Sequence, residues 1–325
     1  MTITHLERMQ SCIRGEKVDR PPVSLWRHFP VDDQTPEGLA QATLQFQTIY
    51  DFDLVKVSPS SSFCLKDWGV EDAWMGDTEG TRRYTKRVIT RPQDWEKLPV
   101  LEPTAKHLGA QLACLRMIRA GLGPEVPVIQ TIFSPLAQAK NLAGAEMLLV
   151  HLRRYPQALF KGLETIAEST RRFMVAAREA GVDGYFYAVQ HAQAHLLSED
   201  EYNTFGLPFD RTLLEPAQEL WCNVLHIHGQ DIYFKLLTSL DFQIINWHDR
   251  DTEPSLSKAR EEFTGVLCGG IGRDTLVYQN PEQVQNEAEE ALRDTGGTRF
   301  LLSTGCVVPI IAPHGNILKA RRSVE

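Results

Sequence analysis

The chain has 325 residues, 42% of them hydrophobic, and its formal net charge at pH 7 is -8. The hydrophobic content is enough for a substantial core, and it excludes disorder as the main state. The negative charge argues against a general nucleic-acid-binding protein, whose phosphate contacts require a basic surface.

The spacing of cysteines and apolar residues bears on the cellular compartment of the protein. The six cysteines lie far apart in the sequence, and no charged-then-apolar leader opens the chain. No apolar run approaches the roughly 20 residues that a membrane span needs. P-loop, Gly-x-Gly-x-x-Gly and Gly-x-Ser-x-Gly motifs are also absent. We therefore expect a cytoplasmic protein with reduced thiols and with neither a membrane nor a nucleic acid as partner.

The first half of the chain alternates between helical and extended patterns. Apolar spacing and turn residues predict helices over 4–13, 35–50, 104–121, 137–149 and 155–180, and strands over 23–29, 53–59 and 127–135. Residues 63–103 interrupt this rhythm with a turn signal at 77–80 and a short helical pattern over 92–98. We interpret this segment as an insertion containing a hairpin, placed after the second strand.

The second half of the chain repeats a strand and a helix at regular spacing. It predicts strands over 184–190, 220–228, 242–249, 265–271 and 299–306, separated by helices that begin near 202, 231, 255 and 281. Eight strands that alternate with helices indicate an α/β fold, a closed parallel (β/α)8 barrel of the TIM type. No linker divides the chain, so we expect one domain over residues 1–325.

Three metal-ligand side chains fall at one rim of this predicted barrel. His226 and His228 are two residues apart on a strand, so both imidazoles point to the same face. Cys306 ends the last strand, and the C-terminal ends of all barrel strands meet at one face. Nitrogen and sulfur donors favour zinc, with His248 or Asp249 as a candidate further ligand. The structural alternative is a hydrogen-bonded core histidine and a small buried cysteine.

Four more polar residues at strand ends are candidate catalytic residues. Arg27 could bind an anionic group of a substrate, or could cap a neighbouring helix. Tyr187, Gln190 and Asp249 could orient the substrate or a ligand histidine. For Tyr187, packing in the core with a satisfied hydroxyl is the alternative.

Several landmarks along the chain resemble the uroporphyrinogen decarboxylase superfamily. They are Gly15-Glu16-Lys17-Val18-Asp19-Arg20-Pro21-Pro22-Val23, Asp67-Trp68-Gly69, Phe133-Ser134-Pro135, Gly269-Gly270-Ile271 and Ser303-Thr304-Gly305-Cys306. The superfamily includes the decarboxylase and zinc methyltransferases that act on methylated corrinoids or other methyl donors. The resemblance implies a (β/α)8 barrel and often a homodimer.

Residue chemistry separates the two branches of that superfamily. The decarboxylase carries a Gln-Ala-Gly-Arg stretch, an Asp after strand two, a Phe-Asp-Ser and a Gly-His-Gly. In their places this chain has Arg27-His28-Phe29, Ser58-Pro59-Ser60, Ala188-Val189-Gln190 and Gly305-Cys306-Val307. The methyltransferases use His-x-Cys on strand five and a Cys on strand eight as zinc ligands, and here His226-Ile227-His228 and Cys306 stand there. The chain resembles the methyltransferase branch more closely.

The resemblance implies a zinc-dependent methyltransferase. It would move a methyl group to a small thiol-type acceptor from a corrinoid carried by a partner protein, or from another methyl donor. One alternative is a metal-free decarboxylase (lyase) of a tetrapyrrole or other carboxylic acid, which chelators would leave active. The other is a non-catalytic barrel that binds a tetrapyrrole or corrinoid.

Overall fold

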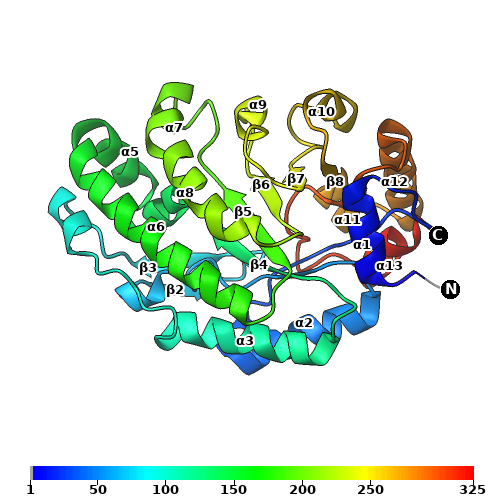
Figure 1. The fold of residues 1–325 in the computed structure, drawn as a ribbon, viewed down its shortest axis with the longest axis horizontal. Helices are drawn as coiled ribbons and strands as arrows, with labels where there is room; N and C mark the ends of the chain where they lie inside the picture. The colour runs from blue at the N-terminus through cyan, green and yellow to red at the C-terminus, as the bar shows by residue number, and fades with distance from the viewer. Residues whose placement is uncertain (1–2) are drawn as a thin grey trace.

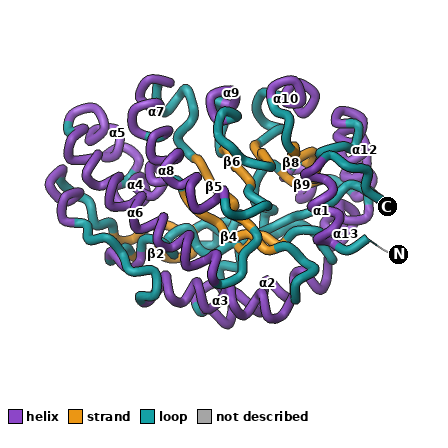
Figure 2. Tube along the Cα trace, in the orientation of Figure 1, coloured by secondary structure: helices purple, strands orange, loops and turns teal. Residues whose placement is uncertain are grey.

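The computed structural model describes residues 3–325 and has a curled parallel sheet inside a ring of helices (Figures 1 and 2). The sheet contains seven strands in the order β1-β4-β5-β6-β7-β8-β9. They are β1 (Val55–Val57), β4 (Val128–Phe133), β5 (Gly184–Val189), β6 (Val224–Ile227), β7 (Ile244–Trp247), β8 (Val266–Ile271) and β9 (Phe300–Thr304). All are buried along their length, as expected for parallel strands covered on both faces.

The segment that follows Pro22 closes the sheet into a barrel. On one side the Ser24 amide donates to the Leu302 carbonyl of β9 at 3.0 Å, and on the other the Asp53 amide donates to the Val23 carbonyl at 2.9 Å. The predicted TIM-type barrel is confirmed. The predicted strand over 23–29 is reduced to one bridge, Val23 to Leu302. Pro22 has no amide hydrogen and the Val23 amide bonds to the Asp53 carboxylate, so a regular ladder cannot form here.

Helices follow the barrel strands and cover the outside of the sheet. Several begin at residues suited to a helix start: Thr4 and Asn280 form capping boxes, and proline opens α2, α4, α6 and α12. The helices are α1 (His5–Arg14), α2 (Pro36–Tyr50), α3 (Lys106–Leu122), α4 (Pro135–Ala143), α5 (Ala145–Arg154), α6 (Pro156–Glu179), α7 (Glu199–Phe205), α8 (Leu207–Gln218), α9 (Phe234–Leu237), α10 (Leu256–Glu262), α11 (Arg273–Tyr278), α12 (Pro281–Thr295) and α13 (His314–Arg322).

A hairpin lies in the long segment between β1 and β4. Its strands β2 (Glu71–Trp74) and β3 (Arg82–Lys86) pair antiparallel. The connecting residues are tied to loops that follow barrel strands: the Ile310 amide donates to the Thr78 carbonyl at 2.7 Å, and Glu79 pairs with Arg273 at the start of α11. The hairpin therefore lies over the C-terminal ends of the barrel strands.

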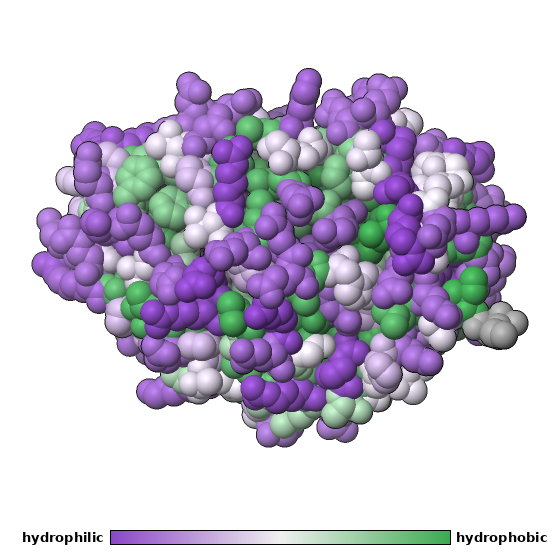
Figure 3. Space-filling model, viewed as in Figure 1, coloured by the Kyte–Doolittle hydropathy of each residue, from purple (hydrophilic) through white to green (hydrophobic). Residues whose placement is uncertain are grey.

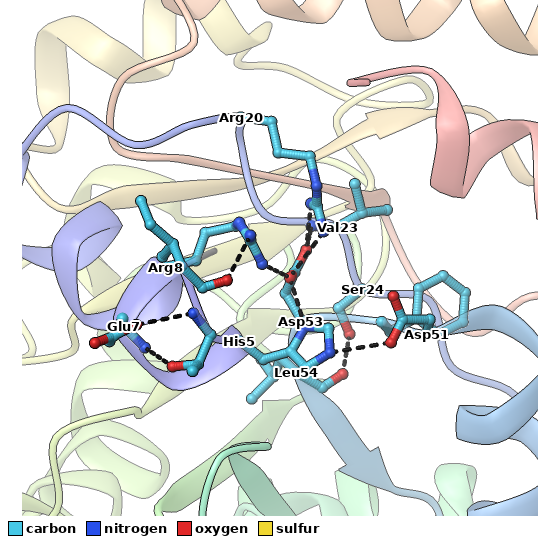
Figure 4. A network of polar contacts seen from close by, with 12 residues as sticks. His5, Glu7, Arg8, Arg20, Val23, Ser24, Asp51, Asp53 and Leu54 are labelled. Carbon is cyan, nitrogen blue, oxygen red and sulfur yellow. Dashed lines mark hydrogen bonds and ion pairs between the residues drawn. The ribbon is translucent and has the colours of Figure 1, made fainter. Parts of the chain in front are cut away.

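One buried carboxylate ties the N-terminal segment to the barrel (Figure 4). The Asp53 side chain is fully buried and accepts from Arg8 at 2.7 Å, from Arg20 at 2.6 Å and from the Val23 amide at 2.8 Å. His5 Nδ1 lies 2.8 Å from the same carboxylate. Burial alone would raise the pKa of Asp53, but these hydrogen bonds hold it well below its usual range.

The outer surface is mostly polar on the face drawn in Figure 3, where apolar side chains are scattered between polar ones. Among residues 3–325, no helix is both long and apolar enough to span a membrane.

We predict that Asp53→Asn will lower the free energy of unfolding by about 3 kcal/mol at pH 7, because it leaves buried guanidinium groups without their anion. The folded-state pKa of Asp53 is lowered, so its stabilisation is present above the ordinary carboxylate pKa of about 4 and is lost as the pH falls through the folded value. Denaturant unfolding of the parent and the variant at pH 7 and at about pH 2 measures this, because at pH 4 most of the stabilisation is still present. The control is Asp51→Asn, at a carboxylate 64% exposed; an equal loss in both variants would contradict the prediction.

Candidate metal centre

Three histidines and one cysteine converge at the C-terminal end of the barrel. The donor atoms of His226, His228, His248 and Cys306 all lie within 4.8 Å of one another. The Cys306 sulfur is 3.8 Å from His226 Nε2 and 3.8 Å from His228 Nδ1. His248 Nε2 is 3.2 Å from His228 Nδ1. The structure therefore brings together the three predicted ligands and the candidate fourth.

The barrel strands account for this convergence. His226 lies in β6, and His228 is the first residue after that strand. His248 directly follows β7, and Cys306 lies two residues after the end of β9. A Cβ atom on Gly305 would stand 2.6 Å from the Trp247 carbonyl oxygen and 2.7 Å from His248 Cα. Glycine at this position therefore lets the chain pass beside β7 and place the thiol against the imidazoles.

Asn246 on β7 determines how His226 presents its nitrogens. The Asn246 amide nitrogen donates to the Cys268 carbonyl at 2.8 Å and to the Thr304 carbonyl at 3.0 Å, which leaves its oxygen facing His226 Nδ1 at 2.7 Å. His226 therefore carries its hydrogen on Nδ1, and its Nε2 lone pair points toward Cys306. The sequence pattern did not single out Asn246, although an amide between the apolar residues of a buried strand was the available signal.

The electrostatics of the group favour a thiolate. Burial alone would raise the pKa of the Cys306 thiol, but the close imidazoles of His226, His228 and His248 hold it well below its usual range. Burial lowers the pKa of His226. A thiolate beside a neutral imidazole is the protonation state in which both groups bind metals.

The dimensions of the group suit a tetrahedral ion. With Zn–N bonds of about 2.0–2.1 Å and Zn–S bonds of about 2.3 Å, tetrahedral ligands lie roughly 3.3–3.8 Å apart. The contacts around Cys306 and between His228 and His248 measure 3.2–3.8 Å. These three contacts match that spacing. The most distant donor atoms lie within 4.8 Å of each other, so the group would contract slightly around a zinc-sized ion.

Two of the predicted catalytic residues lie against other partners. The Arg27 guanidinium lies 5.2 Å from the Phe29 ring centre and 5.3 Å from that of Phe46 on α2. The Tyr187 hydroxyl donates to Asp210 of α8 at 2.6 Å. Arg27 therefore packs against aromatic rings beside α2, and Tyr187 turns toward the helix layer. A direct role for either residue finds no support in these contacts.

The other two predicted catalytic residues differ in position. Asp249 accepts a hydrogen bond from the Gly270 amide at 2.9 Å, so its carboxylate lies against the β8 backbone. Burial raises the pKa of Asp249 to about 7. Gln190 lines a cavity of about 710 Å³ that His228 also lines. Of the four predicted catalytic residues, Gln190 is the one in this cavity.

Lys56 is a buried cation inside the barrel that the sequence pattern did not single out. Its ammonium lies 4.4 Å from the ring centre of Phe186, and that ring stacks on His226 with 5.0 Å between centres. Burial lowers the pKa of Lys56 to about 7. A lysine within the apolar strand Val55–Val57 was the signal that could have pointed to it.

Comparison with known proteins places the chain in a family. The pattern that describes the family "Uroporphyrinogen decarboxylase (URO-D)" matches residues 4–325. A methylcobamide:CoM methyltransferase, MtbA, from Methanosarcina acetivorans is 21% identical over 97% of this chain and 96% of its own length. A uroporphyrinogen decarboxylase from Chlorobium limicola is 26% identical over 81% of this chain and 75% of its own length.

A solved structure shares the same fold. The methyltransferase from Methanosarcina mazei superposes with a TM-score of 0.85 at 21% identity, covering 98% of both chains. Because the family pattern spans nearly the whole sequence, the chain belongs to the uroporphyrinogen decarboxylase family.

Proposed function

We propose that this protein is a zinc-dependent methyltransferase that moves a methyl group from a corrinoid to a thiol-type small molecule. The corrinoid would be carried by a partner protein. The observation that supports this most strongly is the convergence of His226, His228, His248 and Cys306 on one point at the barrel mouth. The methyltransferase relatives of similar length support the same reaction class.

Different residues of the chain would bind the metal, orient a ligand and admit the substrate. His226, His228 and Cys306 would hold the ion, and zinc would supply the chemistry of lowering the pKa of a bound thiol. Asn246 fixes the His226 ring. The cavity beside His228, with Gln190 in its wall, would admit the acceptor.

His248 is the donor that we assign to give way when a thiol enters. Four protein donors fill a tetrahedral site, whereas catalytic sites keep one position for substrate. His226 is held by a 2.7 Å hydrogen bond, but His248 Nδ1 has only a 3.5 Å approach to the Asp251 carboxylate, which is 47% exposed. Of these two imidazoles, His248 is the less firmly oriented, so we expect it to exchange before His226.

A metal-free decarboxylase is the second candidate function. The decarboxylase relatives favour it, and so does the buried Lys56 ammonium, which could bind a carboxylate. The two candidates differ in their response to chelators, because only the methyltransferase would depend on the metal.

We predict that the purified parent protein contains about one equivalent of zinc and that Cys306→Ala and His226→Ala/His228→Ala lose it while remaining folded. Elemental analysis with circular dichroism measures this. Chelation should abolish methylation of a thiol by methylcobalamin, and zinc should restore it. A parent protein that stays empty after incubation with zinc would rule out this mechanism and favour the decarboxylase.

His248→Ala should behave differently from Cys306→Ala. We expect it to retain about one equivalent of zinc with an affinity lowered by about 10- to 100-fold, because three donors and a solvent ligand remain. Competition with a chromophoric chelator measures the affinity. Complete loss of zinc in His248→Ala would show that His248 is an indispensable ligand and cannot be the one exchanged.

Asn246→Leu should lower zinc affinity by about 10- to 100-fold without removing any ligand, because His226 loses the acceptor for its Nδ1 hydrogen. The control is Gln130→Leu, another buried amide in a barrel strand, whose side chain bonds to Gln111 of α3. The same chelator competition measures both variants. Equal losses in the two would mean that Asn246 acts only through the stability of the barrel.

A further inference from the structure

The two strands of the hairpin are joined by residues 75–81, the hairpin connection, which lies over the barrel mouth. Every residue of β2 and β3 is at least partly exposed, whereas the barrel strands are buried along their length. The Thr78 carbonyl of the connection accepts from the Ile310 amide at 2.7 Å. Segments with few buried contacts open at a low cost in free energy, so the hairpin connection can move without disrupting the core.

One side chain of the hairpin connection reaches a cation beside the metal centre. Glu79 pairs with Arg273, the first residue of α11. The Arg273 side chain is 22% exposed, so the pair is partly shielded from solvent. Burial alone would lower the pKa of Arg273, but the Cys306 thiolate and the Glu79 carboxylate raise it. Arg273 is therefore within electrostatic reach of the metal donors.

Asp251 lies between Arg273 and His248. A single oxygen of its carboxylate, Oδ2, is 3.5 Å from His248 Nδ1 and 4.0 Å from Arg273 Nη2. The Asp251 amide donates to the His248 carbonyl at 2.8 Å, which keeps the two residues together in the loop after β7. Both side-chain distances exceed that of a normal hydrogen bond, so a small movement of Arg273 decides which partner this oxygen binds.

The four side chains are therefore linked by competition. While Glu79 holds Arg273, the Asp251 carboxylate is available to the Nδ1 hydrogen of His248. A carboxylate at that nitrogen orients the ring and makes Nε2 a better metal ligand. If Glu79 leaves, Arg273 loses its nearest anion and pairs with Asp251 instead, because a partly buried guanidinium needs an anionic partner. His248 then loses the group that orients it.

We propose that Arg273 and Asp251 are positioning residues through which the hairpin connection determines whether His248 binds the metal. This inference rests on the proposed function, in which His248 gives way to the thiol, and it adds how that exchange is controlled. With the connection in place, His248 completes the set of four donors. A bulky methyl donor that approaches the metal over the barrel mouth would displace the connection, so the position for the acceptor opens when the donor arrives.

Glu79→Gln imitates the displaced connection. We expect zinc affinity to fall and the affinity of the bound metal for a thiol to rise, each by about fivefold or more. The opposite directions separate this effect from a disturbed fold, which would lower both affinities. Asp251→Asn should produce the same two changes, because it removes the partner of His248 directly.

Double variants test the order of the residues. The effect of Glu79→Gln should vanish in Arg273→Gln, where nothing competes for Asp251, and in His248→Ala, where no imidazole is left to exchange. A direct effect of the Glu79 charge on the metal would persist in both backgrounds, so the non-additivity identifies the route.

The probe is 2-mercaptoethanol, a neutral thiol, titrated into protein loaded with Co²⁺, because an added thiolate ligand strengthens the cobalt–sulfur absorption band. Zinc affinity is measured without thiol, by competition with a chromophoric chelator. The control is Glu71→Gln, which removes a carboxylate of the same hairpin that pairs with the exposed Lys86. This control should match the parent in both measurements.

The outcomes separate this inference from the proposed function. Unchanged affinities in Glu79→Gln, or changes that persist in the Arg273→Gln or His248→Ala background, would overturn the inference and leave the methyltransferase proposal standing. If 2-mercaptoethanol changes no cobalt spectrum, thiol coordination and the proposed function are contradicted. The zinc affinities then decide: a fall in Glu79→Gln that is absent in the Arg273→Gln background supports the link to His248. A parent protein that binds neither metal contradicts both proposals.

Discussion

The closed barrel depends on the carboxylate of Asp53. The extended segment at Val23 makes one bridge to β9 and has no regular ladder with β1, so backbone bonds alone hold it weakly. The buried carboxylate compensates by binding the Val23 amide directly and by gathering Arg8 and Arg20 around it. A charge inside a protein is tolerated only with such partners. The geometry of the metal donors follows from this closure, because Cys306 and His226 extend from strands whose separation the barrel fixes.

Within that barrel, strand alternation and one glycine place donors that are 80 residues apart in the sequence within 3.8 Å. The inward position on β6 puts His226 above Phe186, and the next strand supplies Asn246 at the height of the His226 ring. Gly305 then allows the backbone after β9 to approach β7. The site is thus held by the most buried strands of the molecule, and its cavity is formed by the hairpin and by helices α4 and α5.

The sequence predicted the part of the site that follows from periodicity. The barrel architecture and the meeting of His226, His228 and Cys306 follow from the strand pattern and from which strand ends are polar. The structure has both, with seven strands in the sheet and a single bridge at Val23 in place of the predicted first strand. The direction of each side chain was harder to predict, because a shift of one residue in register reverses it. Tyr187 points to Asp210, whereas its neighbour Phe186 points to His226. The wall of the cavity beside His228 could not be found this way, because the helices α4 and α5 reach it only through tertiary packing.

The donor set also bears on the kind of substrate that the site would hold. Replacing one thiolate of a His, Cys, Cys set by the imidazole of His228 leaves Cys306 as the only negative ligand, so a divalent ion would keep a net positive charge. Lys56 and Arg273 lie near the same thiol, and each is influenced electrostatically by it. A neutral ligand would leave this excess uncompensated in a buried mouth, whereas an anionic one, such as the thiolate that we propose, would offset it. With His228 in place of a second thiolate, the ion would be a stronger Lewis acid and would favour an anionic ligand.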